Sequence, residues 1–304
     1  MIFGQGAIRC HPYVYAETQS LMKRDAAGFD LAFTSHVGHT VRNLSRAIVL
    51  SLTRGVFAAS PASGVARRYW QKLVWTSASF AFLADIALIS LGGNLKRKEK
   101  ITGRFADIFS WLYLAAATLR RFEAEGRLKE DEAFLHWSMQ YAFGEIQKAF
   151  DGLFKNFDVP VLGLIFRGPV ALWSRLNPFG NGPRDSVGHD VARAMQIPGP
   201  QRDRHTAGIY TPSDPEEALG RLDHALRLVT EGDQVARAIG KAVGAKKLPK
   251  GRPETLIQAA LDAGVITADQ AELMKRAEAA REDAIQVDSF TQEEYMQGVN
   301  ALTR

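Results

Sequence analysis

The stretch RFADIFSWLYLAAATLRR, residues 104–121, decides the fold because its large apolar side chains recur every three or four positions. The apolar positions are Phe105, Ile108, Phe109, Leu112, Ala116 and Leu119. This spacing places them along one side of an α-helix, with Arg104 and Arg120 largely off that side. The stretch therefore predicts an amphipathic helix that packs against other helices.

Three further stretches show the same spacing, at about residues 29–57, 65–91 and 130–154. Ser60-Pro61 and Gly92-Gly93 interrupt the chain between helices, as turn residues do. Alternating β-branched runs, which would indicate strands, are nearly absent. We therefore expect an all-α fold in which residues 25–157 form an antiparallel four-helix bundle.

The amino-acid composition changes after residue 157, since eight of the twelve prolines lie between Pro160 and Pro215. We expect residues 158–212 to form an irregular Pro/Gly-rich segment that wraps over the bundle. Residues 213–304 are predicted to be helical and to include a C-terminal helical hairpin. Capping boxes are expected at Ser213 with Glu216 and at Thr267 with Gln270.

Composition limits the function classes. The 304 residues are 46% hydrophobic and carry a formal net charge of +5, with a pI of about 9.3. This mild positive charge suits phosphates or an anionic membrane surface, but it is dispersed and argues against nucleic acid as a partner. The single cysteine, Cys10, permits no internal disulfide. No secretory leader is visible, so we expect a cytoplasmic location, with peripheral binding to the inner membrane as an alternative.

Residues 73–91, LVWTSASFAFLADIALISL, are long and apolar enough to be considered as a membrane span. Asp85 in the middle would cost about 2.5–3.5 kcal/mol on insertion scales. A buried helix of a bundle is apolar on most sides as well. We favour the bundle helix and keep the span as the alternative.

Candidate catalytic and metal-binding residues are few. His36 and His39 lie on neighbouring helical positions, but a metal needs one or two more ligands and the sequence shows no companion motif. Cys10 and His11 are adjacent, so their side chains diverge rather than form a nucleophile–base pair. No nucleotide-binding loop or nucleophile elbow is present in the sequence. The residues alone predict no catalytic, cofactor-binding or metal-binding residue in this chain.

The run LKRKEK, residues 95–100, is the one candidate binding surface. Its basic side chains are Lys96, Arg97, Lys98 and Lys100. They could meet phosphates or an anionic leaflet, although a solvated corner between helices is the more common role of such a run. Arg67-Arg68 and Arg120-Arg121 could share a face with it. Arg202 and Arg204 are expected to pin the irregular segment to the bundle.

The chain as a whole resembles the C-terminal region of bacterial acyl-CoA dehydrogenases of the fatty-acid-oxidation (FadE) type. The resemblance covers essentially the whole sequence, in order. It is carried by MIFGQGAIRCHPYV (1–14), GHTVRNLSRAIVLSLTRG (38–55), LGGNLKRKEKITGRFADIFSWLYLAAATLRRFEAEGR (91–127), LHWSMQYAFGEIQKAFDGLFKNF (135–157), DSVGHDVARAMQIPGPQRDRHTAGIYTPSDPEEALGRL (185–222) and AEAAREDAIQVDSF (277–290). Residues 92–121 also resemble the extra helical domain of very-long-chain acyl-CoA dehydrogenases, which is associated with membrane contact.

The resemblance implies an enzyme in which FAD accepts a hydride from the acyl-CoA while a glutamate removes the α-proton. In the family this base lies in a Glu-Gly motif shortly before the segment that matches residues 1–14. Glu17 lies on the other side of that segment, so it is not assigned this role. Residues 1–24 are then expected to be a remnant of the last helix of the dehydrogenase bundle, and no FAD is expected to bind this chain alone.

Two functional hypotheses follow. The first is the C-terminal helical part of a FAD-dependent acyl-CoA dehydrogenase of fatty-acid β-oxidation, catalytically incomplete by itself. Its partners would be the N-terminal and β-domains of the same enzyme and, in the complete enzyme, acyl-CoA; a second copy of the chain and an anionic membrane surface are further candidates. The second is a non-catalytic helical scaffold or peripheral membrane-binding module.

Overall fold

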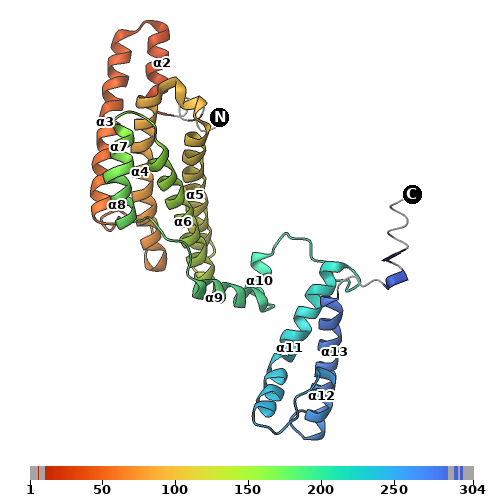
Figure 1. The fold of residues 1–304 in the computed structure, drawn as a ribbon. Coiled ribbons are helices and arrows are strands. Elements are labelled where there is room, and N and C mark those ends of the chain that lie inside the picture. Colours follow the sequence, from red (N-terminus) through yellow and green to blue (C-terminus); the bar gives the residue numbers. More distant parts are fainter. Residues whose placement is uncertain (1–5, 7–10, 287–290, 294, 297–304) are drawn as a thin grey trace. The chain divides into compact units, whose positions relative to one another are not determined.

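The computed structural model describes residue 6 and residues 11–286, 291–293 and 295–296. In this part of the chain every regular element is a helix, which confirms the all-α prediction (Figure 1). Contacts divide the chain into two compact units, residues 1–191 and 192–304. The division of the sequence at residues 24, 157 and 212 stays a prediction. Cys10 lies outside the described residues.

The first unit is built on a series of antiparallel helices that follow one another in the chain. Their bounds are α2 Val14–Lys23, α3 Ala26–Leu52, α4 Arg67–Leu91, α5 Glu99–Ala124 and α6 Glu132–Asn156. Each of these helices contacts the next, from α2 to α6. The four long helices lie where the apolar spacing placed them, with ends shifted by a few residues.

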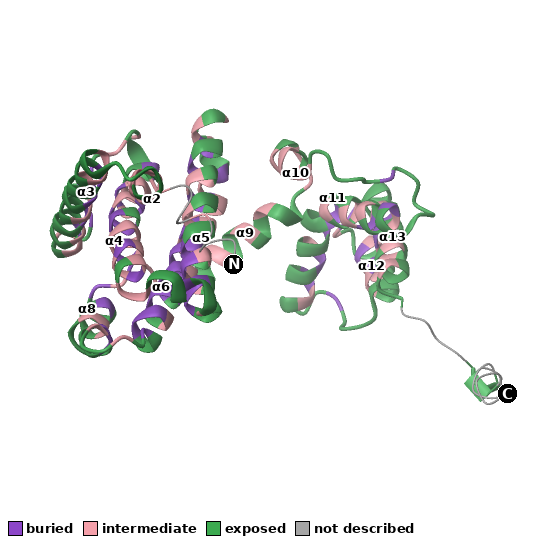
Figure 2. Ribbon diagram, turned by 90° about the horizontal axis from the view of Figure 1, so that it is seen from above, coloured by how far each residue is buried: buried purple, intermediate pink, exposed green. Residues whose placement is uncertain are grey.

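The core of this unit lies between α4, α5 and α6, whose facing sides are buried (Figure 2). Phe105 and Leu119 of α5 and Ile146 and Phe150 of α6 are completely buried. Phe179, which follows the bundle in sequence, packs its ring 4.9 Å from that of Phe150. The Pro/Gly-rich segment therefore contributes to the core as well as covering it.

That segment is more helical than the sequence predicts. It contains α7 Leu162–Ile165, a π-helical turn at Phe166–Val170, α8 Ala171–Leu176, α9 Asp185–Gln196 and α10 Pro200–His205. Pro169 lies inside the π turn. A proline ring clashes with the carbonyl four residues earlier in an α-helix, and the wider π turn is one way a helix adjusts locally. The helical path thus continues through a proline of the segment that we expected to be irregular.

Glycines explain how the segment lies so close to α6. A Cβ atom on Gly180 would come within 2.6 Å of the Phe143 Cβ atom, and one on Gly144 within 2.8 Å of the Gly182 nitrogen. Side chains at these positions would hold the two backbones apart. Gly144 and Gly180 therefore allow residues 179–182 to pack directly against α6.

The apolar helix α4 is buried in the bundle. By length and composition alone, residues 64–97 form a stretch that could cross a membrane. In the structure α4 packs against α3 and α5, with Trp75 and Ala87 in the core and Asp85 only 1% exposed. Asp85 accepts hydrogen bonds within the bundle, so these contacts favour the bundle-helix interpretation.

The second unit has its own core. It is formed by α11 Ala218–Gly244, α12 Pro253–Asp262 and α13 Ala268–Ile285, with Val235, Ile239 and Ile257 buried between them. The Thr267–Gln270 capping box is confirmed.

The capping box expected at Ser213 is wrong. The helix begins at Ala218, and the Glu216 N–H donates to the Asp214 side chain in the preceding turn. The expectation that Arg202 pins the segment to the bundle is also wrong, since Arg202 donates to Asp223 of α11 at 2.8 Å.

Candidate functional site

Helix α3 has an unusual distribution of polar and apolar side chains. Its residues at three- and four-residue steps form an outward apolar stripe, which we call the α3 stripe. The stripe consists of Phe33, Val37, Val41, Leu44, Ile48 and Leu52, all of them exposed. Figure 2 shows the length of this helix largely coloured as exposed.

The inward face of α3 is mostly small or polar instead, with Leu50 as the exception. Its buried residues are Ala32, His36, Asn43 and Leu50. A surface helix of a folded domain normally turns its apolar stripe toward the core, and α3 reverses this order over much of its length. A contiguous exposed apolar surface of this kind marks a site of interaction with another protein or with a membrane.

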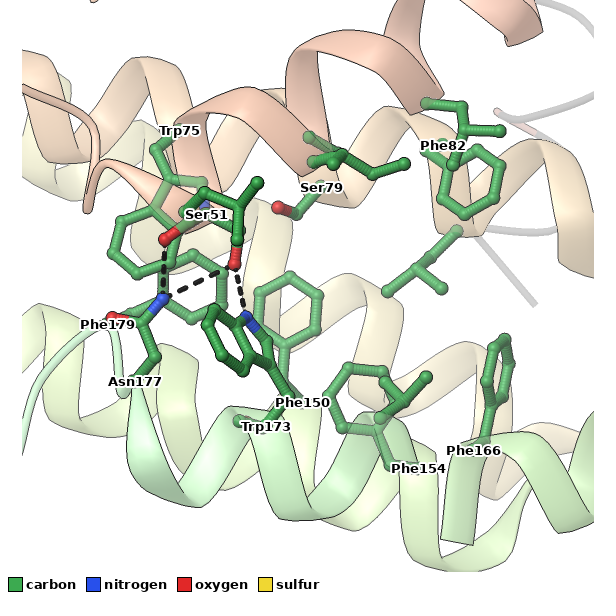
Figure 3. A pocket seen from close by; sticks show the side chains of 17 residues that line it. Ser51, Trp75, Ser79, Phe82, Phe150, Phe154, Phe166, Trp173, Asn177 and Phe179 are labelled. Atoms are coloured by element: carbon green, nitrogen blue, oxygen red, sulfur yellow. Dashed lines mark hydrogen bonds between the residues drawn. The ribbon is translucent and has the colours of Figure 1, made fainter. Parts of the chain in front are cut away.

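The α3 stripe continues into an apolar groove with a volume of about 370 Å³ between α3, α4, α6 and the α7–α8 region (Figure 3). Leu44, Ile48 and Leu52 belong to both features. The remaining lining residues are Ala47, Ser51, Trp75, Ser79, Phe82, Leu83, Phe150, Phe154, Phe166, Val170, Trp173, Ser174, Asn177 and Phe179. None of these is charged, so the groove suits hydrocarbon or apolar side chains rather than an anionic ligand.

Hydrogen bonds close one end of the groove. Ser51 accepts a hydrogen bond from the Trp173 indole N–H at 2.7 Å. The Asn177 amide donates to the Ser51 carbonyl at 2.7 Å (Figure 3). These bonds join the end of α3 to α8 and hold the shape of the groove.

The basic run lies at the turn between α4 and α5. Lys96, Arg97 and Lys100 are exposed and Lys98 is half-buried, so these side chains can meet an anionic surface. The arginine pairs do not join them. Arg67-Arg68 begin α4, a helix of 25 residues and about 37 Å, whose other end leads to Lys96. Arg120-Arg121 lie at the far end of α5.

The two histidines of the HVGH motif have different hydrogen-bond partners, although both rings lie near that of His11. His39 is held by Asn43 and Arg42 of its own helix. His36 instead faces His11 and Asp85, which come from other parts of the chain. Burial alone would raise the pKa of the Asp85 carboxyl, but hydrogen bonds from His11 and Thr40 outweigh it and leave the pKa below its usual value. Sequence reasoning missed this grouping because its members are up to 74 residues apart.

In the part of the chain that the structure describes, the fold is a helical domain with an apolar outer face on α3. A family model described as acyl-CoA dehydrogenase, C-terminal, bacterial type, matches residues 8–290. The chain therefore belongs to this family, which confirms the resemblance seen in the sequence. Among solved structures, no match was found.

Proposed function

We propose that this chain is the C-terminal helical part of a FAD-dependent acyl-CoA dehydrogenase that oxidises acyl-CoA to trans-2-enoyl-CoA in fatty-acid β-oxidation. The family match over residues 8–290 supports the enzyme class. The α3 stripe carries the proposal that the chain acts by association, because α3 leaves its apolar side uncovered while burying its polar one.

The flavin is assigned to other domains of the enzyme. FAD supplies the hydride acceptor of this reaction when bound. Its diphosphate needs cationic groups or clustered backbone N–H donors, whereas the described residues that line the groove carry no charge. The groove therefore does not fit FAD, and we derive no reaction step from the residues of this chain.

The α3 stripe is the surface on which we place the N-terminal and β-domains of the enzyme. It runs from Phe33 to Leu52 and merges with the groove, so one continuous apolar surface is available to the partner. Association would bury these side chains at about 25 cal/mol per Å² of apolar surface. The role of the chain is then to complete and stabilise the helical body of the enzyme.

The test is co-production with a polypeptide that carries the flavin-loaded catalytic domains, followed by size-exclusion chromatography. The wild-type chain should co-elute with flavin absorbance. Val41→Lys combined with Ile48→Lys should abolish co-elution, because two charges would have to be desolvated in the interface.

Tyr113→Lys is the matched control, since Tyr113 is a large side chain, 68% exposed, on α5. This variant should co-elute like the wild type. Co-elution that survives the α3 double substitution would contradict the proposed surface. Self-association of the chain that depends on the same two residues would assign the stripe to a second copy instead.

A peripheral membrane-binding role is the second candidate, favoured by the α7–α8 region. Leu164, Leu172 and Leu176 are exposed there, and Arg167 and Arg175 lie beside them in sequence. Apolar side chains mixed with arginines are typical of segments that lie in a membrane interface. Sedimentation with anionic vesicles at low salt should then occur and should weaken in Leu172→Glu. Absence of sedimentation would exclude this candidate.

A further inference from the structure

Three polar side chains from separate parts of the first unit converge inside the bundle. His11 precedes α2, His36 belongs to α3 and Asp85 to α4. One side-chain nitrogen or oxygen of each lies within 4.8 Å of the others. His36 and Asp85 are 7% and 1% exposed, so bulk water solvates neither group well. Such burial of polar groups is costly unless each has a partner.

His36 has one satisfied and one unsatisfied nitrogen. Its Nδ1 lies 2.8 Å from the Glu17 carboxylate, and because a carboxylate accepts, this nitrogen carries the proton. The Nε2 atom is then an acceptor, and it is buried without a hydrogen-bond partner. It lies 3.8 Å from the Asp85 Oδ1 atom, which is also an acceptor. A proton on Nε2 or a metal ion between the two atoms would satisfy both of them.

The surroundings match those of a histidine metal ligand. Histidines that bind a metal through one nitrogen usually donate their other N–H to a carboxylate, which orients the ring. Glu17 does this for His36. The Asp85 carboxylate is oriented as well. Its Oδ2 atom accepts a hydrogen bond from Thr40 at 2.9 Å, so its Oδ1 atom is the one that faces the two histidines.

His11 is the third member of the cluster with His36 and Asp85. Its Nε2 atom lies 3.0 Å from Asp85 Oδ1, while its Nδ1 accepts from the backbone N–H groups of Tyr13 and Val14. To bind a metal ion through Nε2, the neutral ring carries its proton on Nδ1 instead. A small rotation of the ring would release the Tyr13 and Val14 N–H contacts, which are 3.3 and 3.2 Å long. The carboxylates of Asp85 and of Glu17, which lies behind His36, offset the two charges of a divalent cation.

We propose that His11, His36 and Asp85 form a binding site for a divalent transition-metal ion of the Zn²⁺ class. Two imidazole nitrogens and one carboxylate oxygen are ligands that this class accepts, at about 2.0–2.2 Å from the metal. The ligand atoms lie 3.0 and 3.8 Å from one another, so an ion placed between them reaches each after small side-chain shifts. The ion would tie the segment before α2 to α3 and α4, with its fourth position open to water.

The experiment is titration of the full chain, stripped of metal with a chelator, with Zn²⁺ in a calorimeter and with Co²⁺ in a spectrophotometer. We expect one ion per chain, visible Co²⁺ absorption typical of a four-coordinate site, and a higher melting temperature with metal. His36→Gln and Asp85→Asn should each weaken binding at least ~100-fold because a ligand is lost. Glu17→Gln should weaken binding about 10–100-fold, since only the orienting group is removed.

His39→Gln is the matched control, because His39 lies on the same helix and its ring contacts that of His11 at 5.7 Å, but its nitrogens bond to Asn43 and Arg42 and it is not one of the three converging ligands. It should leave the affinity and the Co²⁺ spectrum unchanged. Circular dichroism of each metal-free variant identifies any that fail to fold, and at least one of His36→Gln and Asp85→Asn must be folded for the comparison. No stoichiometric uptake by the folded wild type, or equal binding by folded His36→Gln and Asp85→Asn, would overturn the site. Equal loss in His39→Gln would overturn the assigned ligands.

Discussion

Asp223 on α11 receives hydrogen bonds from two arginines, Arg227 at 2.7 Å and Arg202 at 2.8 Å. The bond from Arg227 is the largest cause that lowers the pKa of this carboxyl; partial burial opposes it and Arg202 adds to it. Arg202 belongs to α10, so the contact fastens α10 to α11. A single carboxylate thus fastens α10 to α11 within the second unit.

Asp223→Asn should destabilise this contact by about 1 kcal/mol at pH 7, because two charge-assisted bonds become weaker ones. A carboxyl with a lowered pKa in the folded state stabilises above its unfolded pKa of about 3.9. That stabilisation is lost as the pH falls through the lower folded value. Amide hydrogen exchange along α10 should therefore differ between wild type and variant at pH 7, and this difference should shrink as the pH falls below the unfolded pKa of about 3.9. A difference that does not shrink in acid would contradict this origin.

Individual polar side chains were the hardest features to predict from the sequence. Lys96, Arg97, Lys98 and Lys100 form a visible run in the sequence, and the structure places them from the 3-10 helix Gly92–Arg97 to the first turn of α5. The buried cluster gives no such signal, since His11 and Asp85 are 74 residues apart and neither belongs to a ligand motif. Only the packing of α2, α3 and α4 brings these side chains together.

Two glycines inside long helices differ in what surrounds them. Replacing each by alanine therefore distinguishes the effect of helix propensity on stability from the effect of packing against a neighbouring segment. Glycine in a helix interior costs about 1 kcal/mol relative to alanine. A Cβ on Gly103 of α5 meets nothing within 4 Å, whereas one on Gly144 of α6 would lie 2.8 Å from the backbone of Gly182. We expect Gly103→Ala to stabilise the protein by up to ~1 kcal/mol. Gly144→Ala should destabilise it by about 1–3 kcal/mol through overpacking, as measured by denaturant unfolding.

Both substitutions change glycine to alanine in an α-helix, so each is the control for the other. Equal stabilisation by both would show that residues 179–182 do not pack against α6 as they do in the structure.

The sequence predicts the long helices better than it predicts the segments that pack against them. The long helices follow from apolar spacing, but the helical turns around Pro169 depend on a π-helical adjustment that proline statistics disfavour. The N-terminus of α11 shifted to Ala218 because Asp214, rather than Ser213, caps the preceding turn.

In the molecule as a whole, each unit has its own hydrophobic core. Ile257 is 3% exposed in the core of the second unit, and Ile257→Ala should destabilise that unit by about 2–5 kcal/mol through the cavity it creates. Hydrogen exchange should accelerate in α11, α12 and α13 and remain unchanged in α4, α5 and α6. Equal acceleration in both sets of helices would contradict the division into two independently packed units.

We propose that the chain contributes an apolar helical surface to an acyl-CoA dehydrogenase and that other domains supply the flavin chemistry. The visible absorption spectrum of the purified chain, recorded together with an assay for enoyl-CoA formation, tests this most directly. We predict a colourless, inactive chain alone and flavin absorbance with activity once it is co-purified with the catalytic domains. Stoichiometric flavin and turnover in the chain by itself would contradict the proposal that other domains supply the flavin chemistry.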